Sequence, residues 1–233
     1  MYTNVNLAAP IGALLFLGTG FLLFVAGLAL IYSLTRKKFG LARFALITMA
    51  VIIAVYLGVM LIFSLTSEER VLVRGQEKHF CEIDCHLAYS VTDVQHSKTL
   101  GQTMTGVGAN GPTAAGLFRV VTIKTRFDEN TISPTRGNGL LHPNSRVVVV
   151  IDDNGNEYLP SPTGQKALET SQAAGSPFTA PLRPGEFYNT TVVFDLPAGI
   201  TNPVLLIHEG ESMTHFVIGH ENSPLHKKIG FQI

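Results

Sequence analysis

The chain has 233 residues, of which 46% are hydrophobic and 15% are charged, and its formal net charge is zero. The charges are segregated, because residues 1–65 contain four basic and no acidic side chains, whereas the remainder contains 13 basic and 17 acidic ones. Nucleic-acid binding depends on neutralising many phosphates with a basic surface. Residues 66–233 carry more acidic than basic side chains, so we do not expect nucleic acid as a partner.

Two long apolar runs, residues 11–34 and 44–65, predict a transmembrane helical hairpin. At 1.5 Å per residue, each run is long enough to cross about 30 Å of hydrocarbon. The loop between them, residues 35–43, contains four basic residues and no acidic one, so the positive-inside rule predicts that it is cytoplasmic. Both the N-terminus and residues 66–233 are then expected on the periplasmic side of a bacterial inner membrane, with the lipid bilayer as a direct partner.

Neither apolar run contains an ionisable side chain of the kind that transport or proton relay usually requires. The second run instead carries Ala50, Ala54 and Gly58 at four-residue intervals, a small-residue seam that lets another helix approach closely. The seam can be filled by the first helix of the same hairpin or by a helix of a larger membrane complex, and the sequence allows both.

Residues 66–233 predict one outer domain, an antiparallel immunoglobulin-like β-sandwich, because short strands with Gly and Pro turns follow one another without a helical period. The expected strands are 71–73, 87–92, 118–127, 146–151, 187–196, 204–208, 214–218 and a last one near 229–233. The Gly-rich stretch 101–116 is long for a connection and is expected to be mobile or held by a partner. The turn 152–157 contains the Asn-Gly pair of tight hairpins, and its glycine is misplaced for a calcium loop.

Three late runs carry a resemblance to a known family: residues 182–186 (LRPGE), 192–197 (VVFDLP) and 204–207 (VLLI). They resemble the late strands of the bacterial immunoglobulin-like "immunoprotective extracellular" domains and their uncharacterised membrane-anchored relatives. The resemblance covers about a quarter of the chain and consists of turn and core residues. It implies a sandwich fold and transfers no catalytic residue, and the helical anchor and paired cysteines depart from the simplest members.

The two cysteines of the chain, Cys81 and Cys85, lie just after the predicted anchor and are the expected centre of any chemistry. In an oxidising compartment such a pair is expected to form a structural disulfide. The segment must then turn, because an extended C-x3-C would separate the Cα atoms by roughly 13 Å, beyond the reach of a disulfide.

Two cofactor hypotheses compete with the disulfide. Thiolates with the flanking His79 and His86 suit copper, and the C-x3-C spacing resembles the binuclear copper loop of respiratory oxidases, although Tyr89 and Thr92 replace its later ligands. The run from Cys81 to His86 is also one residue longer than the usual haem c attachment motif. Further candidate ligands near the C-terminus are His208, Met213, His215, His220 and His226.

No G-x-S-x-G or H-E-x-x-H motif occurs, so we expect no enzyme activity and no cofactor. The expected role is a non-catalytic accessory or scaffolding subunit that binds integral membrane subunits of a larger complex. An electron-transfer complex, either a respiratory oxidase or a photosynthetic reaction centre, is the preferred host. The alternative is a membrane-anchored periplasmic redox protein that holds copper or haem c at Cys81, Cys85, His86 and His79.

Overall fold

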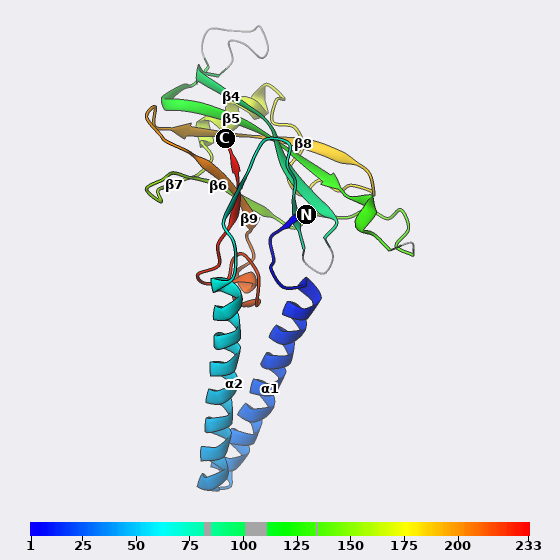
Figure 1. Cartoon of the computed structure of the whole chain (residues 1–233), viewed down its shortest axis with the longest axis vertical. Coiled ribbons are helices and arrows are strands. Elements are labelled where there is room, and N and C mark those ends of the chain that lie inside the picture. Colours follow the sequence, from blue (N-terminus) through cyan, green and yellow to red (C-terminus); the bar gives the residue numbers. More distant parts are fainter. Residues whose placement is uncertain (82–84, 101–110, 134) are drawn as a thin grey trace. The chain divides into compact units, whose positions relative to one another are not determined.

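The computed structural model describes residues 1–81, 85–100, 111–133 and 135–233 (Figure 1). Contacts divide the chain into two compact units. The sandwich unit comprises Met1–Asn4, Glu69–Glu211 and Lys228–Ile233. The hairpin unit comprises Val5–Glu68 and Ser212–Lys227.

The hairpin unit contains two helices that are long and apolar enough to cross a membrane, α1 (Ala9–Thr35) and α2 (Phe39–Leu65). Each has 27 residues and therefore spans about 40 Å. The loop between them is shorter than the predicted 35–43, because α2 already begins at Phe39 and its first turns contain the buried Ala42 and Ala45. Small side chains at these positions let the two helices pack closely.

The third part of the hairpin unit is the segment Ser212–Lys227, which corrects the predicted strand at 214–218. Its first residues form a 3-10 helix, η2 (Ser212–Phe216). The following residues pair with the chain before α1, since Asn6 N–H donates to the Gly219 carbonyl at 2.8 Å and Val5 forms an isolated bridge with His220. Within the segment, local turns bond the backbone, since the Val217 N–H donates to the Thr214 carbonyl and the His220 N–H to the Val217 carbonyl, both at 3.2 Å.

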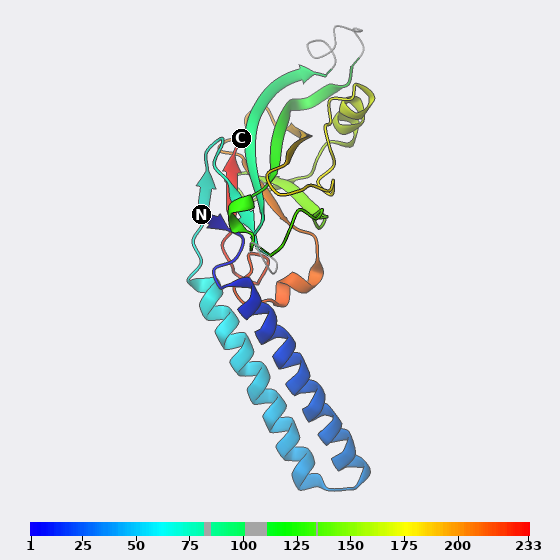
Figure 2. The ribbon, with the colours of Figure 1, turned by 90° about the vertical axis from the view of Figure 1, so that its right-hand side faces the viewer.

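The sandwich unit consists of two five-stranded sheets. One sheet has the order β1-β3-β4-β5-β8, formed by β1 (Tyr2–Thr3), β3 (Lys78–Phe80), β4 (Leu87–Thr99), β5 (Thr113–Phe127) and β8 (Phe187–Leu196). The other has the order β2-β10-β9-β6-β7, formed by β2 (Arg70–Leu72), β10 (Ile229–Gln232), β9 (Val204–Glu209), β6 (Arg146–Ile151) and β7 (Glu157–Tyr158). Figure 2 shows the long, curved β4 and β5 side by side.

Side chains from both sheets fill one hydrophobic core between them. Phe80, Tyr89 and Phe194 come from the first sheet, and Val150 and Phe231 from the second, and all are 2% exposed or less. The pairing is not antiparallel throughout, because β1 joins β3 and β2 joins β10 in parallel. Long connections separate the strands of both pairs, and only long connections permit parallel neighbours.

The structure extends the sequence prediction at several strands. The strands at 146–151 and 187–196 have the predicted bounds, whereas β1 and β3 are two short strands without a prediction. Because β1 pairs with β3, the chain's first four residues belong to the sandwich unit, which the predicted boundary at residue 66 did not include. The Gly-rich stretch falls mostly on residues 101–110, which lie outside the described residues.

A helix that the sequence analysis omitted, α3 (Pro162–Thr170), lies in the polar segment before β8. Ser161 caps it by accepting the Gly164 N–H at 3.3 Å, and Pro162 stands in its first turn. A Ser at the N-cap followed by a Pro in the first turn is a sequence signal for the start of a helix. The turn between β6 and β7 is a plain hairpin, in which Asp152 accepts the backbone N–H groups of Asn154 and Asn156 at 2.9 Å each.

Candidate functional site

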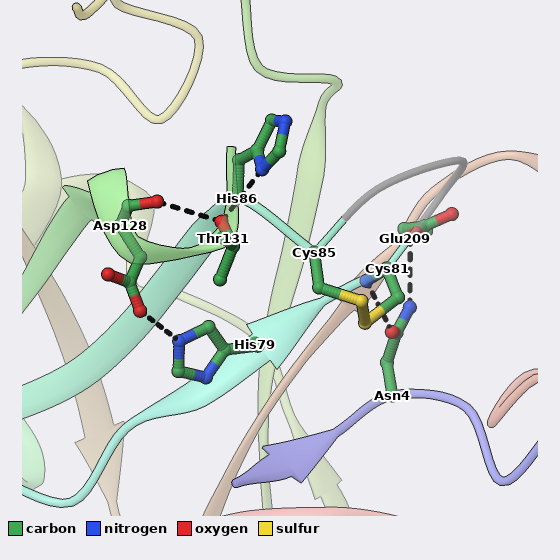
Figure 3. Close-up of a disulfide and its surroundings, with 8 residues drawn as sticks. All are labelled: Asn4, His79, Cys81, Cys85, His86, Asp128, Thr131 and Glu209. Atoms are coloured by element: carbon green, nitrogen blue, oxygen red, sulfur yellow. Dashed lines mark hydrogen bonds and ion pairs between the residues drawn. A yellow bond between two sulfur atoms is a disulfide. The ribbon is translucent and has the colours of Figure 1, made fainter. Parts of the chain in front are cut away.

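Cys81 and Cys85 form a disulfide directly after β3 (Figure 3). Their Cα atoms are 4.0 Å apart, much closer than the roughly 13 Å of an extended C-x3-C segment. The intervening residues 82–84 lie outside the described residues. Both sulfurs are therefore used by the bond between them, and the disulfide prediction holds in the structure.

Asn4 ties the disulfide to both sheets of the sandwich (Figure 3). Its Oδ1 accepts the backbone N–H of Cys81 at 2.7 Å, and its Nδ2 donates to Glu209 Oε1 at 3.1 Å. Cys81 follows β3 in the first sheet, whereas Glu209 ends β9 in the second. All three residues are buried. A carboxamide offers both a donor and an acceptor, so one side chain can bond both groups. The sequence did not point to Asn4, because no motif or pattern of neighbouring residues distinguishes it from the other asparagines.

His79 ends a chain of charged side chains that crosses the first sheet. Its Nε2 lies 3.2 Å from Asp128 Oδ2, and Asp128 Oδ1 lies 3.2 Å from Arg126 Nη1. Arg126 in turn donates two hydrogen bonds to Glu77, at 2.8 and 2.7 Å. Such bidentate pairs are among the stronger charged contacts in proteins. We call these four residues the ion-pair chain.

The ion-pair chain lowers the pKa of its two carboxyl groups. Burial by itself would raise the pKa of the Asp128 carboxyl, but hydrogen bonds from Arg126, His79 and Asn130 together hold that pKa well below its usual value. The hydrogen bond from Arg126 likewise lowers the pKa of Glu77. Both carboxylates therefore stay ionised at neutral pH and pair with the guanidinium of Arg126.

His86 has partners of its own. Its Nδ1 lies 2.7 Å from Thr131 Oγ1, and its ring stacks on Phe127 with the centroids 5.3 Å apart. Figure 3 shows the rings of His79 and His86 engaged with Asp128 and Thr131 and not with the sulfur atoms. The four predicted ligands are thus neighbours along the chain, and the structure does not gather them around one point.

Across the part of the chain that the structure describes, no group of three or more His, Cys, Asp or Glu side chains is arranged to hold a metal ion. The C-terminal candidates are divided between the two units. His208 lies on β9 of the sandwich unit, whereas Met213, His215, His220 and His226 belong to the hairpin unit.

Two buried basic side chains, Lys78 and Arg146, lie in the sandwich beside the disulfide strand, and nothing in the sequence marked them. Lys78 is fully buried on β3, and its Nζ donates to the carbonyls of Ile207 at 2.9 Å and Ile229 at 3.1 Å. The guanidinium of Arg146 lies 4.5 Å from the centroid of the Phe80 ring. Buried charges persist only with such partners, so both residues link the sheets.

The small-residue seam of α2 is open. Ala50, Ala54 and Gly58 are exposed on this chain, and a Cβ added at Gly58 would meet nothing within 4 Å. The buried positions of α2 are others, namely Ala42, Ala45, Met60 and Ser64. The two helices therefore pack on each other, as one of the two readings expected, and they leave the seam exposed.

No protein-family model matches the chain, and no curated protein matches it. Solved structures that resemble it include an uncharacterised β-sandwich protein of Clostridium difficile, with 8% identity over 72% of this chain and 95% of that one. The secreted protein MPT63 of Mycobacterium tuberculosis has 12% identity over 72% and 100% of the two chains. A conserved hypothetical protein of Bacillus anthracis has 16% identity over 60% and 90%.

All three structures have a TM-score of 0.39. The resemblance to the immunoprotective extracellular domains is thus a loose likeness of fold. A shared fold does not carry a function with it.

Proposed function

We propose that this protein is a non-catalytic, membrane-anchored scaffolding subunit that binds another integral membrane protein through the small-residue seam of α2. One observation carries the proposal: Ala50, Ala54 and Gly58 form a regularly spaced seam that α1 leaves exposed. Small residues at this spacing let a second helix backbone approach closely, and helix association in lipid depends on such packing.

The proposal includes a membrane anchor formed by α1 and α2. Support comes from their length, their mean hydropathy of 2.5 and 2.8 over the best window, and the apolar side chains that cover their outer surfaces. The basic residues between the helices favour a cytoplasmic turn. The sandwich, which we expect to be of the immunoglobulin-like kind, then lies on the periplasmic side of a bacterial inner membrane.

An outer domain tied together by a disulfide and fixed charges suits a structural role. Asp128 and Glu77 are held in the ionised state, and His79 and His86 each have a protein partner. An electron-transfer complex, a respiratory oxidase or a photosynthetic reaction centre, is the class of host that we propose to search first.

The test is affinity purification of the tagged full chain from its native membranes in mild detergent, followed by identification of the subunits that stay bound. Gly58→Leu fills the seam, and we expect it to abolish this co-purification. Gly20→Leu is the matched control, because Gly20 of α1 is equally open, with nothing within 4 Å of an added Cβ. We expect Gly20→Leu to keep the partners.

Equal recovery of partners with Gly58→Leu and Gly20→Leu would show that the seam is not the contact. Recovery of the wild-type chain alone would contradict the scaffolding role itself. Copper or haem that co-purifies with the wild type and is lost from a Cys81→Ala, Cys85→Ala variant would favour the redox alternative.

A further inference from the structure

Part of the segment Ser212–Lys227 in the hairpin unit has an inverted distribution, with polar side chains buried and large apolar ones exposed. Its polar turn His220–Ser223 is buried, with no residue more than 6% exposed. Three of its apolar side chains, Met213, Phe216 and Leu225, are 57%, 56% and 71% exposed, whereas Ile218 is buried. A segment that faced water would be expected to show the opposite pattern, so the inversion indicates that the outer face of this segment meets an apolar medium.

The segment is fastened beside the outer ends of both helices. Asn6, just before α1, donates its N–H to the Gly219 carbonyl at 2.8 Å, and Ser67, just after α2, accepts the Lys227 N–H at 2.8 Å. The Tyr56 hydroxyl of α2 donates to the Phe216 carbonyl. Tyr56 lies nine residues before the end of α2, which is about 14 Å along the helix, so η2 lies beside the outer part of α2.

The polar groups of the segment are satisfied largely from within it. The Asn222 side chain donates to Thr214 Oγ1 at 2.8 Å, and the Ser223 hydroxyl donates to the Val217 carbonyl at 2.6 Å. Successive turns bond the backbone, as in the Val217 N–H to Thr214 carbonyl bond of 3.2 Å. Polar groups that are hydrogen-bonded within the segment lower the cost of placing it at the apolar edge of a bilayer.

We infer that Ser212–Lys227 is an interfacial element that inserts Met213, Phe216 and Leu225 into the outer lipid leaflet and sets the depth of the anchor. We expect lipid to cover these three side chains, because they continue the exposed apolar surface of α1 and α2 within one compact unit. Amphipathic segments at a bilayer bury their apolar side by about 5–10 Å. The inference rests on the proposed membrane anchor and adds a third lipid contact to its two helices.

The chain contains no tryptophan, so a single introduced tryptophan reports its own surroundings. The experiment compares Phe216→Trp and Leu225→Trp of the full chain in proteoliposomes made with phospholipids brominated at shallow or deep acyl positions. Both side chains are more than half exposed, so neither substitution removes core packing. Leu57→Trp on α2 is the reference for a residue within the membrane, and Leu159→Trp of the sandwich unit is the water-exposed reference.

We expect Phe216→Trp and Leu225→Trp to emit at shorter wavelength than Leu159→Trp and to be quenched more by shallow than by deep bromines. Aqueous iodide should quench both several-fold less than it quenches Leu159→Trp. Emission and iodide quenching equal to those of Leu159→Trp would overturn the inference and leave this face to a protein partner. If Leu57→Trp also escapes the brominated lipids, the membrane anchor itself fails, which separates the two failures.

Discussion

Removal of the disulfide tests how the cysteine turn stabilises the sandwich. The perturbation is Cys81→Ala with Cys85→Ala, where alanine is chosen because Cys81 is 2% exposed and a serine would bury a hydroxyl. The bridge closes a very short loop, with a sequence separation of four. In the chain-entropy account, a five-residue loop lowers the entropy of the unfolded chain by an amount worth about 2 kcal/mol.

The assay is unfolding of the full chain in detergent at neutral pH, followed by the far-ultraviolet circular dichroism of the β-sandwich. A loss of about 2 kcal/mol corresponds to a decrease in Tm of about 4–8 °C for a domain of this size. The wild type treated with a reductant should decrease by the same amount, and the double variant should not respond to the reductant.

Two results would refute this reasoning. A loss of 5 kcal/mol or more, or failure to fold, would mean that the bridge orders far more than its own turn. An unchanged Tm would mean that loop closure does not stabilise this domain.

Three further changes probe other contacts of the sandwich unit. Asn4→Ala removes hydrogen bonds from two buried groups and should lower the free energy of unfolding by about 2 kcal/mol. Denaturant titration measures this change. An unchanged midpoint would show that Asn4 does not stabilise the contact between the sheets. Asp128→Asn weakens the contact with Arg126, and because the pKa of Asp128 is lowered in the fold, its stabilisation is present at pH 7 and is lost as the pH falls below about 4. The difference from the wild type should therefore shrink between pH 7 and pH 3 in the same titration, and a constant difference would contradict the assignment. Gly116→Ala places a Cβ 2.0 Å from the Leu196 carbonyl oxygen, and this overpacking should lower the free energy of unfolding by about 1–3 kcal/mol. A melting curve identical to that of the wild type would contradict this expectation.

Patterns that arise from local chemistry could be predicted from the sequence alone. The two apolar runs, the hairpin turn at Asp152 and the strands with β-branched or alternating residues, such as 146–151, all reflect neighbours along the chain. The disulfide was also predictable, because its cysteines are close in sequence and a turn is enough to join them. The strand expected at 214–218 was wrong, because this segment bonds its backbone locally, with a 3-10 helix over Ser212–Phe216 and a Val217 N–H to Thr214 carbonyl bond.

Only the tertiary structure decided how distant residues combine. Asn4 and Glu209 are 205 residues apart, yet their hydrogen bond links the disulfide to the second sheet. The spacing of Ala50, Ala54 and Gly58 along the sequence is the same whether these residues pack against α1 or stay exposed. The rotation of α2 about its own axis determines which of the two occurs. Periodicity along a chain specifies which side chains share a face, whereas the partner of that face depends on packing between elements far apart in the sequence.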